Sequence, residues 1–564
     1  MEIAKKNWFR RGLEFFFSLG AALLLATIIR QMWFEPQEIP TGSMRPTFKE
    51  QDLLIVSKTP FGLNIPLKTK HFYFDPSLVQ RTGIVIWSGE GMAHLDSSAK
   101  FLGLVPYTKR FIKRCLGKPG DILYFYGGKI YGIDREGHPL DTLLHSPFLQ
   151  DLEHIPYNHF EGRPAFVKDR SQEGGFQEIF HHFNYPLGRY RVVRGKVKGE
   201  VFDGKNWVED QPLAATSSHT LIRTLSDFAG IRNFAMARLL SSEEAQAQPL
   251  FPKEILHTGK VFLELSHTPH LTSTSPRLDE KLGFFVQGYT TWIPLQTSHL
   301  HALMQSMYTC RFEVSNGKAR AYRHESVASH ENDPDLPGVP DGTYEFYYGK
   351  AYSIGWGGIV SELAENHPLY SQNPDYIQKI FNIGIDMSRL VEPGTKGSER
   401  GKFFPRRYAY FRDGDLYVMG GLLFRKEDPL LQEFLIRERV RQEGSSTNNP
   451  YVAFQDYGPP LLRDGSLDKD WIVNFGVKIP EKHYLMLGDN HAMSQDSRYF
   501  GPVPEDNLQG APTLLLWPPS PRWGSPQEPA RPWITLASVT VWTTASLAIF
   551  VYLFWRRREK KKLG

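Results

Sequence analysis

Two long apolar stretches frame a chain whose other hydrophobic positions often alternate with polar ones. Residues 12–34 and 532–555 are almost entirely apolar, and each is long enough to cross a bilayer as a helix. Between them, short alternating runs are separated by Gly and Pro, which is typical of antiparallel hairpins. The strands predicted in this way cover residues 52–58, 83–87, 110–116, 121–134, 477–487 and 512–517.

The middle of the chain has a different pattern. Apolar residues recur at helical spacing in residues 219–240, 295–308 and 429–443, and polar segments predict loops at 241–249, 270–276 and 444–450. Three segments also show a strand, a Gly turn and a strand, at residues 123–133, 344–354 and 408–419. Their irregular intervals favour repeated hairpins in a sheet over a solenoid.

These patterns predict a mainly β fold, in which an antiparallel β body carries a large α+β insertion and a transmembrane helix at each end. The chain of 564 residues is long enough for about two to four domains. The predicted divisions are a basic tail (1–11), an anchor (12–34), the first part of the β body (35–134), the insertion (135–470), the second part of the β body (471–531), a transmembrane helix (532–555) and a second basic tail (556–564).

Positive charge is concentrated outside the two apolar stretches. The net charge is +5, yet residues 1–11 carry +3 and residues 556–564 carry +5, so residues 12–555 sum to −3. No basic body therefore argues for nucleic-acid binding. Because positive residues stay cytoplasmic, both termini are expected inside and residues 35–531 outside. A cleaved signal peptide is the alternative at the N-terminus, but no A-x-A site precedes Glu35, which favours an uncleaved anchor.

Cysteines and histidines indicate no metal site. Cys115 and Cys310 are the only cysteines, and they are more typical of small buried apolar residues than of a disulfide. His324 and His330 are six residues apart and do not share a helix face, while His181 and His182 are adjacent. Neither a metal nor a cofactor is predicted.

The segment EIPTGSMRPTF, residues 38–48, follows the first apolar stretch and restrains a serine. Gly42 permits unusual backbone angles, and prolines on both sides of Ser43 stiffen the chain. Such a cluster is typical of an ordinary turn, but it could also hold a nucleophile. Neither S-x-x-K nor G-x-S-x-G is present around Ser43.

A candidate base lies in RFIKRCLGKPGD, residues 110–121. On an extended strand, Phe111, Lys113 and Cys115 share one face. Burial disfavours an ammonium group and lowers the pKa of a lysine, which a neutral base near pH 7 requires. An exposed strand lysine is the alternative that these residues alone favour.

The blocks PTGSMRPTF, DLLIVSK, FIKRCLGKPGD and GDNHAMSQDSRYFGPVP follow one another in that order behind the N-terminal apolar stretch. This ordered combination resembles bacterial type I signal peptidase, the leader peptidase family of Ser/Lys serine proteases. The resemblance covers these four blocks, and the predicted insertion and the C-terminal apolar stretch lie outside it.

The resemblance implies a β-rich fold with Ser43 as nucleophile and neutral Lys113 as general base. It implies that the Thr41 hydroxyl and the Ser43 backbone N–H form the oxyanion hole, and that Ser494 orients the lysine. The implied apolar walls of the substrate pockets, which exclude all but small side chains, are Ile39, Met44, Phe48, Phe111 and Ile112. The implied structural support is Gly488, Asp489, Asn490, Asp496 and Arg498.

Two departures from the family pattern stand out. His491, Ala492 and Met493 replace the usual Arg-Asp-Asn, so polar support around the lysine is expected to differ. Lys118 replaces a residue that is more often apolar.

The implied function is that of a membrane-bound serine endopeptidase that removes signal peptides from exported preproteins. Its implied location is the bacterial cytoplasmic (inner) membrane, as a multi-pass protein with the catalytic part on the exoplasmic, periplasmic face in contact with the lipid bilayer. A catalytically inactive, membrane-tethered binding or scaffold module on the same fold is the alternative. A self-cleaving repressor-like protease would need a DNA-binding region, which the charge distribution disfavours. The role and any binding partner of residues 135–470 stay open.

Overall fold

The computed structural model divides the chain into two compact units. Unit 1 comprises Met1–Pro40, Glu50–Cys115 and Val503–Gly564, and unit 2 comprises Thr41–Lys49 and Leu116–Pro502. The boundaries predicted at 135 and 470 stay a prediction. The residues that the structure describes are 2–66, 68–92, 95, 97–101, 105–156, 166–169, 177–183, 185–193, 196–202, 206–209, 228–267, 277–279, 283–285, 289–322, 334–384, 389–390, 402–403, 407–445 and 451–563.

Unit 1 is built around antiparallel strands in the order β1-β2-β34-β5-β8. Buried and half-buried residues alternate in β2, as expected for a strand with one covered face, whereas every residue of β5 is buried. The strands are β1 (Phe34–Glu38), β2 (Leu53–Ser57), β34 (Leu508–Trp517), β5 (Ile84–Ser88) and β8 (Arg110–Gly117), with the hairpins β3 (Gly62–Asn64)/β4 (His71–Phe74) and β6 (Ser98–Phe101)/β7 (Val105–Thr108).

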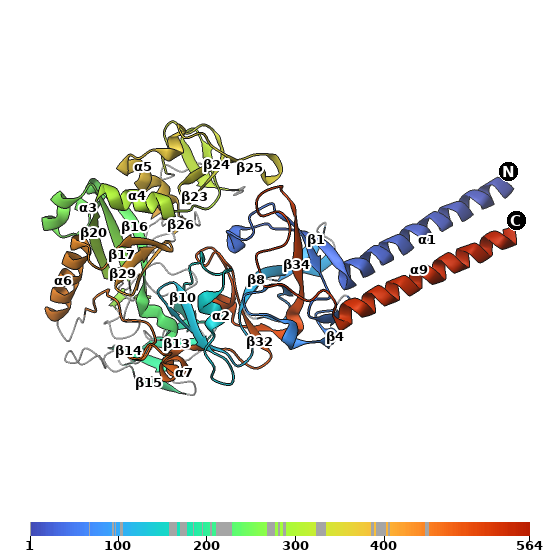
Figure 1. The fold of residues 1–564 in the computed structure, drawn as a ribbon, viewed down its shortest axis with the longest axis horizontal. Helices are drawn as coiled ribbons and strands as arrows, with labels where there is room; N and C mark the ends of the chain where they lie inside the picture. Colours follow the sequence, from blue (N-terminus) through green and yellow to red (C-terminus); the bar gives the residue numbers. More distant parts are fainter. Residues whose placement is uncertain are drawn as a thin grey trace. The chain divides into compact units, whose positions relative to one another are not determined.

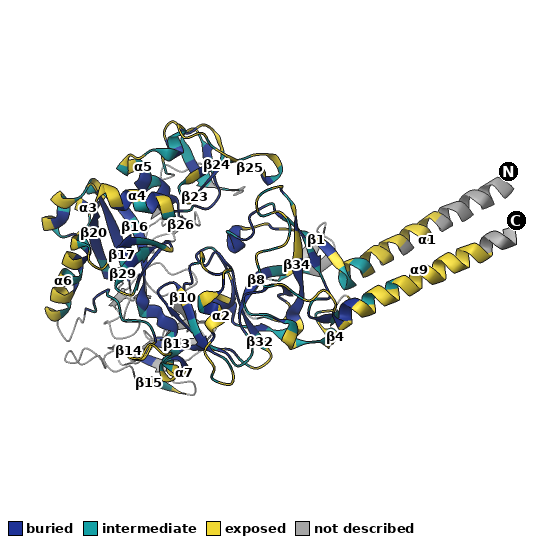
Figure 2. Cartoon of the chain, viewed as in Figure 1, coloured by how far each residue is buried: buried dark blue, intermediate teal, exposed yellow. Residues whose placement is uncertain are grey.

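Two long helices, α1 (Glu2–Met32) and α9 (Leu536–Leu563), extend from unit 1 (Figure 1). Segments Phe15–Met32 and Leu536–Arg558 are long and apolar enough to cross a membrane, and Figure 2 shows exposed residues along both helices. The second helix begins at Leu536 rather than at residue 532 because Thr535 and Ser538 cap it by exchanging side-chain hydrogen bonds. The Trp33 and Trp542 rings meet edge to face, with centroids 4.4 Å apart.

Unit 2 is also rich in antiparallel strands, and Figure 1 shows several sheets within it. Its described sheets run in the orders β10-β9-β31, β11-β12-β13-β14-β15, β20-β17-β16-β28-β29-β30 and β22-β21-β23-β24-β25. The fold is therefore mainly antiparallel β. The strands are β9 (Ile122–Tyr126), β10 (Lys129–Ile133), β11 (Phe166–Asp169), β12 (Gln177–His182), β13 (Tyr185–Val193), β14 (Lys196–Phe202), β15 (Trp207–Glu209), β16 (Phe234–Ser241), β17 (Val261–His267), β18 (Arg277–Asp279), β19 (Gly283–Phe285), β20 (Tyr289–Leu295), β21 (Phe312–Ser315), β22 (Lys318–Ala321), β23 (Gly342–Tyr347), β24 (Lys350–Ile354), β25 (Val360–Glu362), β26 (Arg389–Leu390), β27 (Lys402–Phe403), β28 (Tyr408–Arg412), β29 (Asp415–Val418), β30 (Gly421–Phe424), β31 (Val477–Lys478) and β32 (His483–Leu487).

Helices are short in the described part of unit 2. The longest of these helices pack against neighbouring strands. They contribute apolar side chains, among them Leu303, Phe381 and Phe434, to one continuous buried core. The helices are α2 (Asp141–His145), α3 (Ser242–Gln246), α4 (Thr297–Ser306), α5 (Pro374–Ile383), α6 (Pro429–Glu443), α7 (Lys469–Phe475) and α8 (Ser497–Phe500).

The three predicted hairpins are confirmed. Strand pairs β9/β10, β23/β24 and β28/β29 are antiparallel and in register across two-residue turns. Both turn residues have positive φ in each case, as a type I′ turn requires, and a glycine occupies the second position every time. The turns are Gly127-Gly128, Tyr348-Gly349 and Asp413-Gly414.

Two predictions for the middle of the chain are wrong in part. Of the helix predicted over 219–240, residues 219–227 lie outside the described residues, and Phe234–Ser241 form strand β16. Six of its eight residues are buried, so the apolar run satisfies a strand covered on both faces as well as a helix. The loop predicted at 241–249 contains α3, which a reciprocal Ser241 and Glu244 capping box starts. The helices predicted at 295–308 and 429–443 are confirmed, and the loop at 270–276 and residues 446–450 lie outside the described part.

Candidate active site

Ser43 lies on a tight turn in unit 2. Residues Gly42–Met44 form a 3₁₀ turn, and the Arg45 backbone N–H donates to the Gly42 carbonyl at 3.1 Å. Ser43 is 9% exposed, while Met44 and Phe48 are fully buried. The whole turn, including the serine, is thus packed into the body of the unit.

A distant segment holds this turn through the backbone. The Asn490 N–H donates to the Ser43 carbonyl at 3.1 Å, and the Asn490 side-chain amide donates to the Gly42 carbonyl at 3.1 Å. At Gly488 an added Cβ would lie 2.4 Å from the Ser43 carbonyl oxygen and 2.2 Å from the Ser494 Oγ. Only glycine permits this approach, since real Cβ atoms do not come so close to other heavy atoms.

Asp489 and Thr41 add side-chain contacts to the turn. The Thr47 hydroxyl donates to the Asp489 carboxylate, and both side chains are buried. The Thr41 hydroxyl is 3.5 Å from Ser43 Oγ, to which it donates. Thr41 therefore presents a hydroxyl group beside the candidate nucleophile.

The Asp496–Arg498 ion pair lies fully buried in unit 2. Arg498 donates from Nε and from one terminal nitrogen to the two Asp496 oxygens, each at 2.8 Å. Asp496 also accepts from the Gly488 N–H at 3.1 Å, and Arg498 donates to the Ser494 carbonyl at 3.2 Å. The pair therefore supports both ends of the segment that holds Ser43.

The departure at His491 has a structural explanation. His491 Nδ1 lies 3.0 Å from the Ile155 backbone nitrogen and 3.2 Å from the Ile155 carbonyl oxygen, and His491 Nε2 lies 3.2 Å from His154 Nδ1. Burial, the Arg498 guanidinium and His154 hold the pKa of His491 well below its ordinary value. A neutral His491 imidazole thus stands where the family pattern has arginine.

Lys113 lies in unit 1 on β8, opposite Val85 of β5. It is 4% exposed, although its strand neighbour Phe111 is only half-buried and stacks on Trp87 with ring centroids 4.8 Å apart. The exposed strand lysine that the residues alone favour is therefore wrong, and the burial that a neutral base requires is present. Its pairing with Ser43 stays a prediction.

The predicted pocket residues divide between the two units. Ile39, Phe111 and Ile112 belong to unit 1, whereas Met44 and Phe48 belong to unit 2. All except Phe111 are buried. Their assembly into one substrate pocket stays a prediction.

The comparisons with known proteins agree with the four sequence blocks. A model of the signal peptidase family (signal peptidase, peptidase S26) matches residues 12–177 and 436–517. Signal peptidase I of Buchnera aphidicola subsp. Schizaphis graminum is 30% identical over 123 residues, which are 22% of this chain and 33% of that protein. Together these matches support the assignment of the chain to the type I signal peptidase family.

Other relatives match shorter or less similar segments. Signal peptidase I of Rickettsia akari is 24% identical over 198 residues, 33% of this chain and 70% of that protein. The mitochondrial ATP-independent inner membrane protease subunit 1a of Arabidopsis thaliana is 40% identical over 60 residues, 11% of this chain and 31% of that protein. The chain spans between 33% and 44% of the length of three bacterial signal peptidases that it matches.

The family match places the candidate residues on shared segments. Ser43, Lys113 and the segment from Gly488 to Arg498 lie inside the matched residues, and residues 178–435 lie between the two matched segments. Sequence reasoning missed contacts from the unmatched residues, above all Glu345, which accepts from Arg45 and Lys49. A lone acidic residue in a hairpin carries no sequence signal for such a contact.

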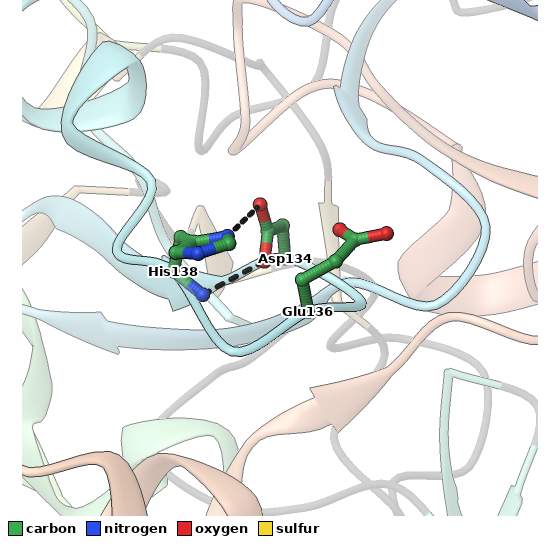
Figure 3. A group of neighbouring side chains, drawn as sticks. All are labelled: Asp134, Glu136 and His138. Carbon is green, nitrogen blue, oxygen red and sulfur yellow. Dashed lines mark hydrogen bonds and ion pairs between the residues drawn. The ribbon is translucent and has the colours of Figure 1, made fainter.

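Asp134, Glu136 and His138 form a polar group in the turn that follows β10 (Figure 3). Asp134 accepts from the His138 backbone N–H at 2.8 Å and lies 3.3 Å from its ring Nδ1. These contacts close the turn, and both Glu136 and His138 are exposed. Of the histidines considered from sequence, His324 and His330 lie outside the described residues, and His181 and His182 end strand β12.

Proposed function

We propose that this chain is a membrane-tethered serine endopeptidase that removes signal peptides from exported preproteins. The observation that carries the proposal is the support of the Ser43 turn by Gly488 and Asn490, residues of two family-matched segments that are far apart in sequence. These contacts fix the backbone conformation of the serine, and a nucleophile needs such a fixed orientation for attack.

In the proposed reaction, Ser43 Oγ attacks the carbonyl carbon after the last residue of the signal peptide, and neutral Lys113 accepts the hydroxyl proton. The Ser43 N–H and the Thr41 hydroxyl donate to the oxyanion of the tetrahedral intermediate. Collapse of the intermediate breaks the peptide bond, and the leaving amine takes the proton from Lys113.

Deacylation uses the same groups. Lys113 takes a proton from water, which attacks the acyl ester and releases the signal peptide, and Ser43 recovers its proton from Lys113. The burial of Lys113 supports this role, because a buried lysine loses its proton more readily than an exposed one. Ser494, which is buried, is proposed to orient the Lys113 amine.

Substrate choice is proposed to depend on exclusion by apolar walls. Rigid packed walls admit alanine-sized side chains and reject larger ones, since a larger group would disturb the packing. The proposed wall residues are Ile39, Met44, Phe48, Phe111 and Ile112.

The proposed location is the bacterial cytoplasmic membrane, with α1 and α9 spanning the bilayer and the catalytic residues on the outer face. Two helices of suitable length and the basic residues beyond them support this topology. The substrates are proposed to be preproteins whose cleavage sites emerge at that membrane surface.

The test uses full-length, detergent-solubilised protein and a preprotein with an A-x-A site. Ser43→Ala and Lys113→Ala should each abolish cleavage, whereas Lys118→Ala, a partly exposed lysine in the same sequence block, should cleave at the wild-type rate. Cleavage by Ser43→Ala at the wild-type rate, or an inactive wild type, would refute the proposal. An inactive wild type that still binds the preprotein would favour the scaffold alternative.

A further inference from the structure

Glu345 is buried at a position where the strand pattern predicts exposure. Its neighbours Tyr344 and Phe346 on β23 are both part of the main core of unit 2, so Glu345 points to the opposite side of the strand. A glutamate on the outer side of a sheet normally meets water. Glu345 is nevertheless 0% exposed.

Residues that follow the candidate nucleophile lie against Glu345. Arg45 donates from a terminal nitrogen to Glu345 Oε2 at 2.9 Å, and Lys49 donates to Oε1. Arg311, next to β21 in the same sheet, lies 3.5 Å from Oε2. The Lys49 amine also lies 5.0 Å from the centre of the Tyr347 ring, an attractive cation–π contact.

These contacts keep the carboxylate ionised despite its burial. Burial alone would raise the pKa of Glu345, but the charges of Arg45, Lys49 and Arg311 hold it well below its ordinary value. Hydrogen bonds between buried ionised partners are strong and directional, and loss of one partner leaves the others charged in a dry environment. The cluster therefore resists small displacements of the segment that carries Arg45 and Lys49.

The segment of residues 41–49 is thus held from two directions within unit 2. Asn490 holds the backbone at Gly42 and Ser43, and Glu345 holds the side chains of Arg45 and Lys49. The Asn490 contacts come from family-matched residues, whereas Glu345, Arg311 and Tyr347 lie in residues 178–435, which the family model leaves unmatched.

We propose that Glu345 is a positioning residue that holds the Ser43 turn in its attacking geometry. The inference rests on the proposed role of Ser43 as nucleophile. It gives the unmatched residues a part in the reaction: they complete the support of the catalytic turn.

The test compares two buried carboxylates. Glu345→Gln keeps the size of the side chain and removes its charge. Glu438→Gln is the matched control, because Glu438 is buried in the same unit and accepts hydrogen bonds from Thr291 and Tyr451. Amide hydrogen exchange over residues 41–49, kcat, KM and the thermal midpoint are measured on full-length protein in detergent.

Glu345→Gln should speed amide exchange across residues 41–49 by at least about 10-fold and lower kcat about 10²-fold with little change in KM, because a slightly misplaced nucleophile binds substrate but attacks slowly. Glu438→Gln should lower the thermal midpoint and leave both exchange in 41–49 and kcat unchanged. If Glu345→Gln does not fold, Glu345→Asp is used for the same comparison, because its shorter side chain keeps the charge but moves it away from Arg45 and Lys49.

The inference would be overturned if residues 41–49 of Glu345→Gln exchanged their amide hydrogens at the wild-type rate. An equal loss of kcat in Glu438→Gln would have the same consequence. Faster exchange with an unchanged kcat would also overturn it. Because exchange needs no substrate, the two proposals fail separately: an inactive wild type refutes the peptidase function, and exchange still decides whether Glu345 holds the turn.

Discussion

The Asn490 N–H donates to the Ser43 carbonyl oxygen at 3.1 Å, and its side-chain amide reaches the adjacent Gly42 carbonyl, 448 residues away in the sequence. One residue near the end of unit 2 thus holds two successive carbonyl groups of the serine turn. Its contacts orient the backbone on which Ser43 Oγ and the Ser43 N–H both depend.

Asn490→Ala should lower kcat about 5- to 10-fold, since the loss of one hydrogen bond is worth about 1 kcal/mol and loosens the turn. Preprotein cleavage at saturating substrate measures the effect. Asn507→Ala is the control, because the Asn507 amide also donates to backbone carbonyls, those of Ser88 and Glu90 in unit 1. Equal losses of kcat in the two variants would contradict the prediction.

Gly488→Ala should reduce kcat by at least about 10²-fold, because its Cβ would displace the Ser43 carbonyl or Ser494. The thermal midpoint should also fall, since overpacking costs about 1–3 kcal/mol. Gly355→Ala is the control: its Cβ would have the Ile359 carbonyl at 3.7 Å as its nearest neighbour, an ordinary contact. If Gly488→Ala cleaved the preprotein at the wild-type rate, the close approach of residue 488 to the Ser43 carbonyl oxygen would not be needed for activity.

Glu35 forms ion pairs with three cations where α1 meets β1: Arg30 at 3.1 Å, Lys58 at 3.0 Å, and Arg110. Burial opposes ionisation of Glu35, but Lys58 and Arg110 outweigh it and lower its pKa to about 2. Glu35→Gln should therefore destabilise the protein by about 3 kcal/mol, because it leaves Lys58 buried beside Arg110 without its counter-ion.

Lys58→Met should have the opposite effect. Burial and Arg110 lower the pKa of Lys58 to about 8, so the folded protein bears a buried ammonium at a cost of about 3 kcal/mol at pH 7. Between pH 8 and 10.5 the unfolded chain holds a proton that the folded chain lacks, so wild-type stability rises and the advantage of Lys58→Met shrinks. Thermal unfolding in detergent at pH 7 and pH 9 measures this; a difference that does not vary with pH would contradict it.

His267 should make the protein sensitive to acid. Burial lowers its pKa from 6.5 to about 4. Below pH 6.5 the unfolded chain therefore binds a proton that the folded chain does not bind until the pH approaches 4. Stability from this residue is therefore lost as the pH falls from 6.5 to 4, by up to about 3 kcal/mol. The thermal midpoint of His267→Phe should decrease less than that of the wild type between pH 7 and pH 5. An equal decrease in both proteins would show that other groups cause the acid sensitivity.

Local patterns predicted the three hairpins and strands such as β2, β5 and β8 because their determinants are close in sequence. Alternation fixes which side chains of β8 share a face, and glycine meets the positive φ demanded at the second turn position of each hairpin. The same logic failed at β16, where a strand buried on both faces has no alternation to reveal it.

By itself the sequence determined the order of the blocks that carry Ser43, Lys113 and Ser494, the two apolar stretches and the β-rich character, since each depends on neighbours along the chain. Only the tertiary structure decided that Asn490 holds the serine turn, that His491 pairs with His154 and that Glu345 lies buried against Arg45. These contacts join residues far apart in sequence, and the burial that makes them strong arises only when the separate segments pack together.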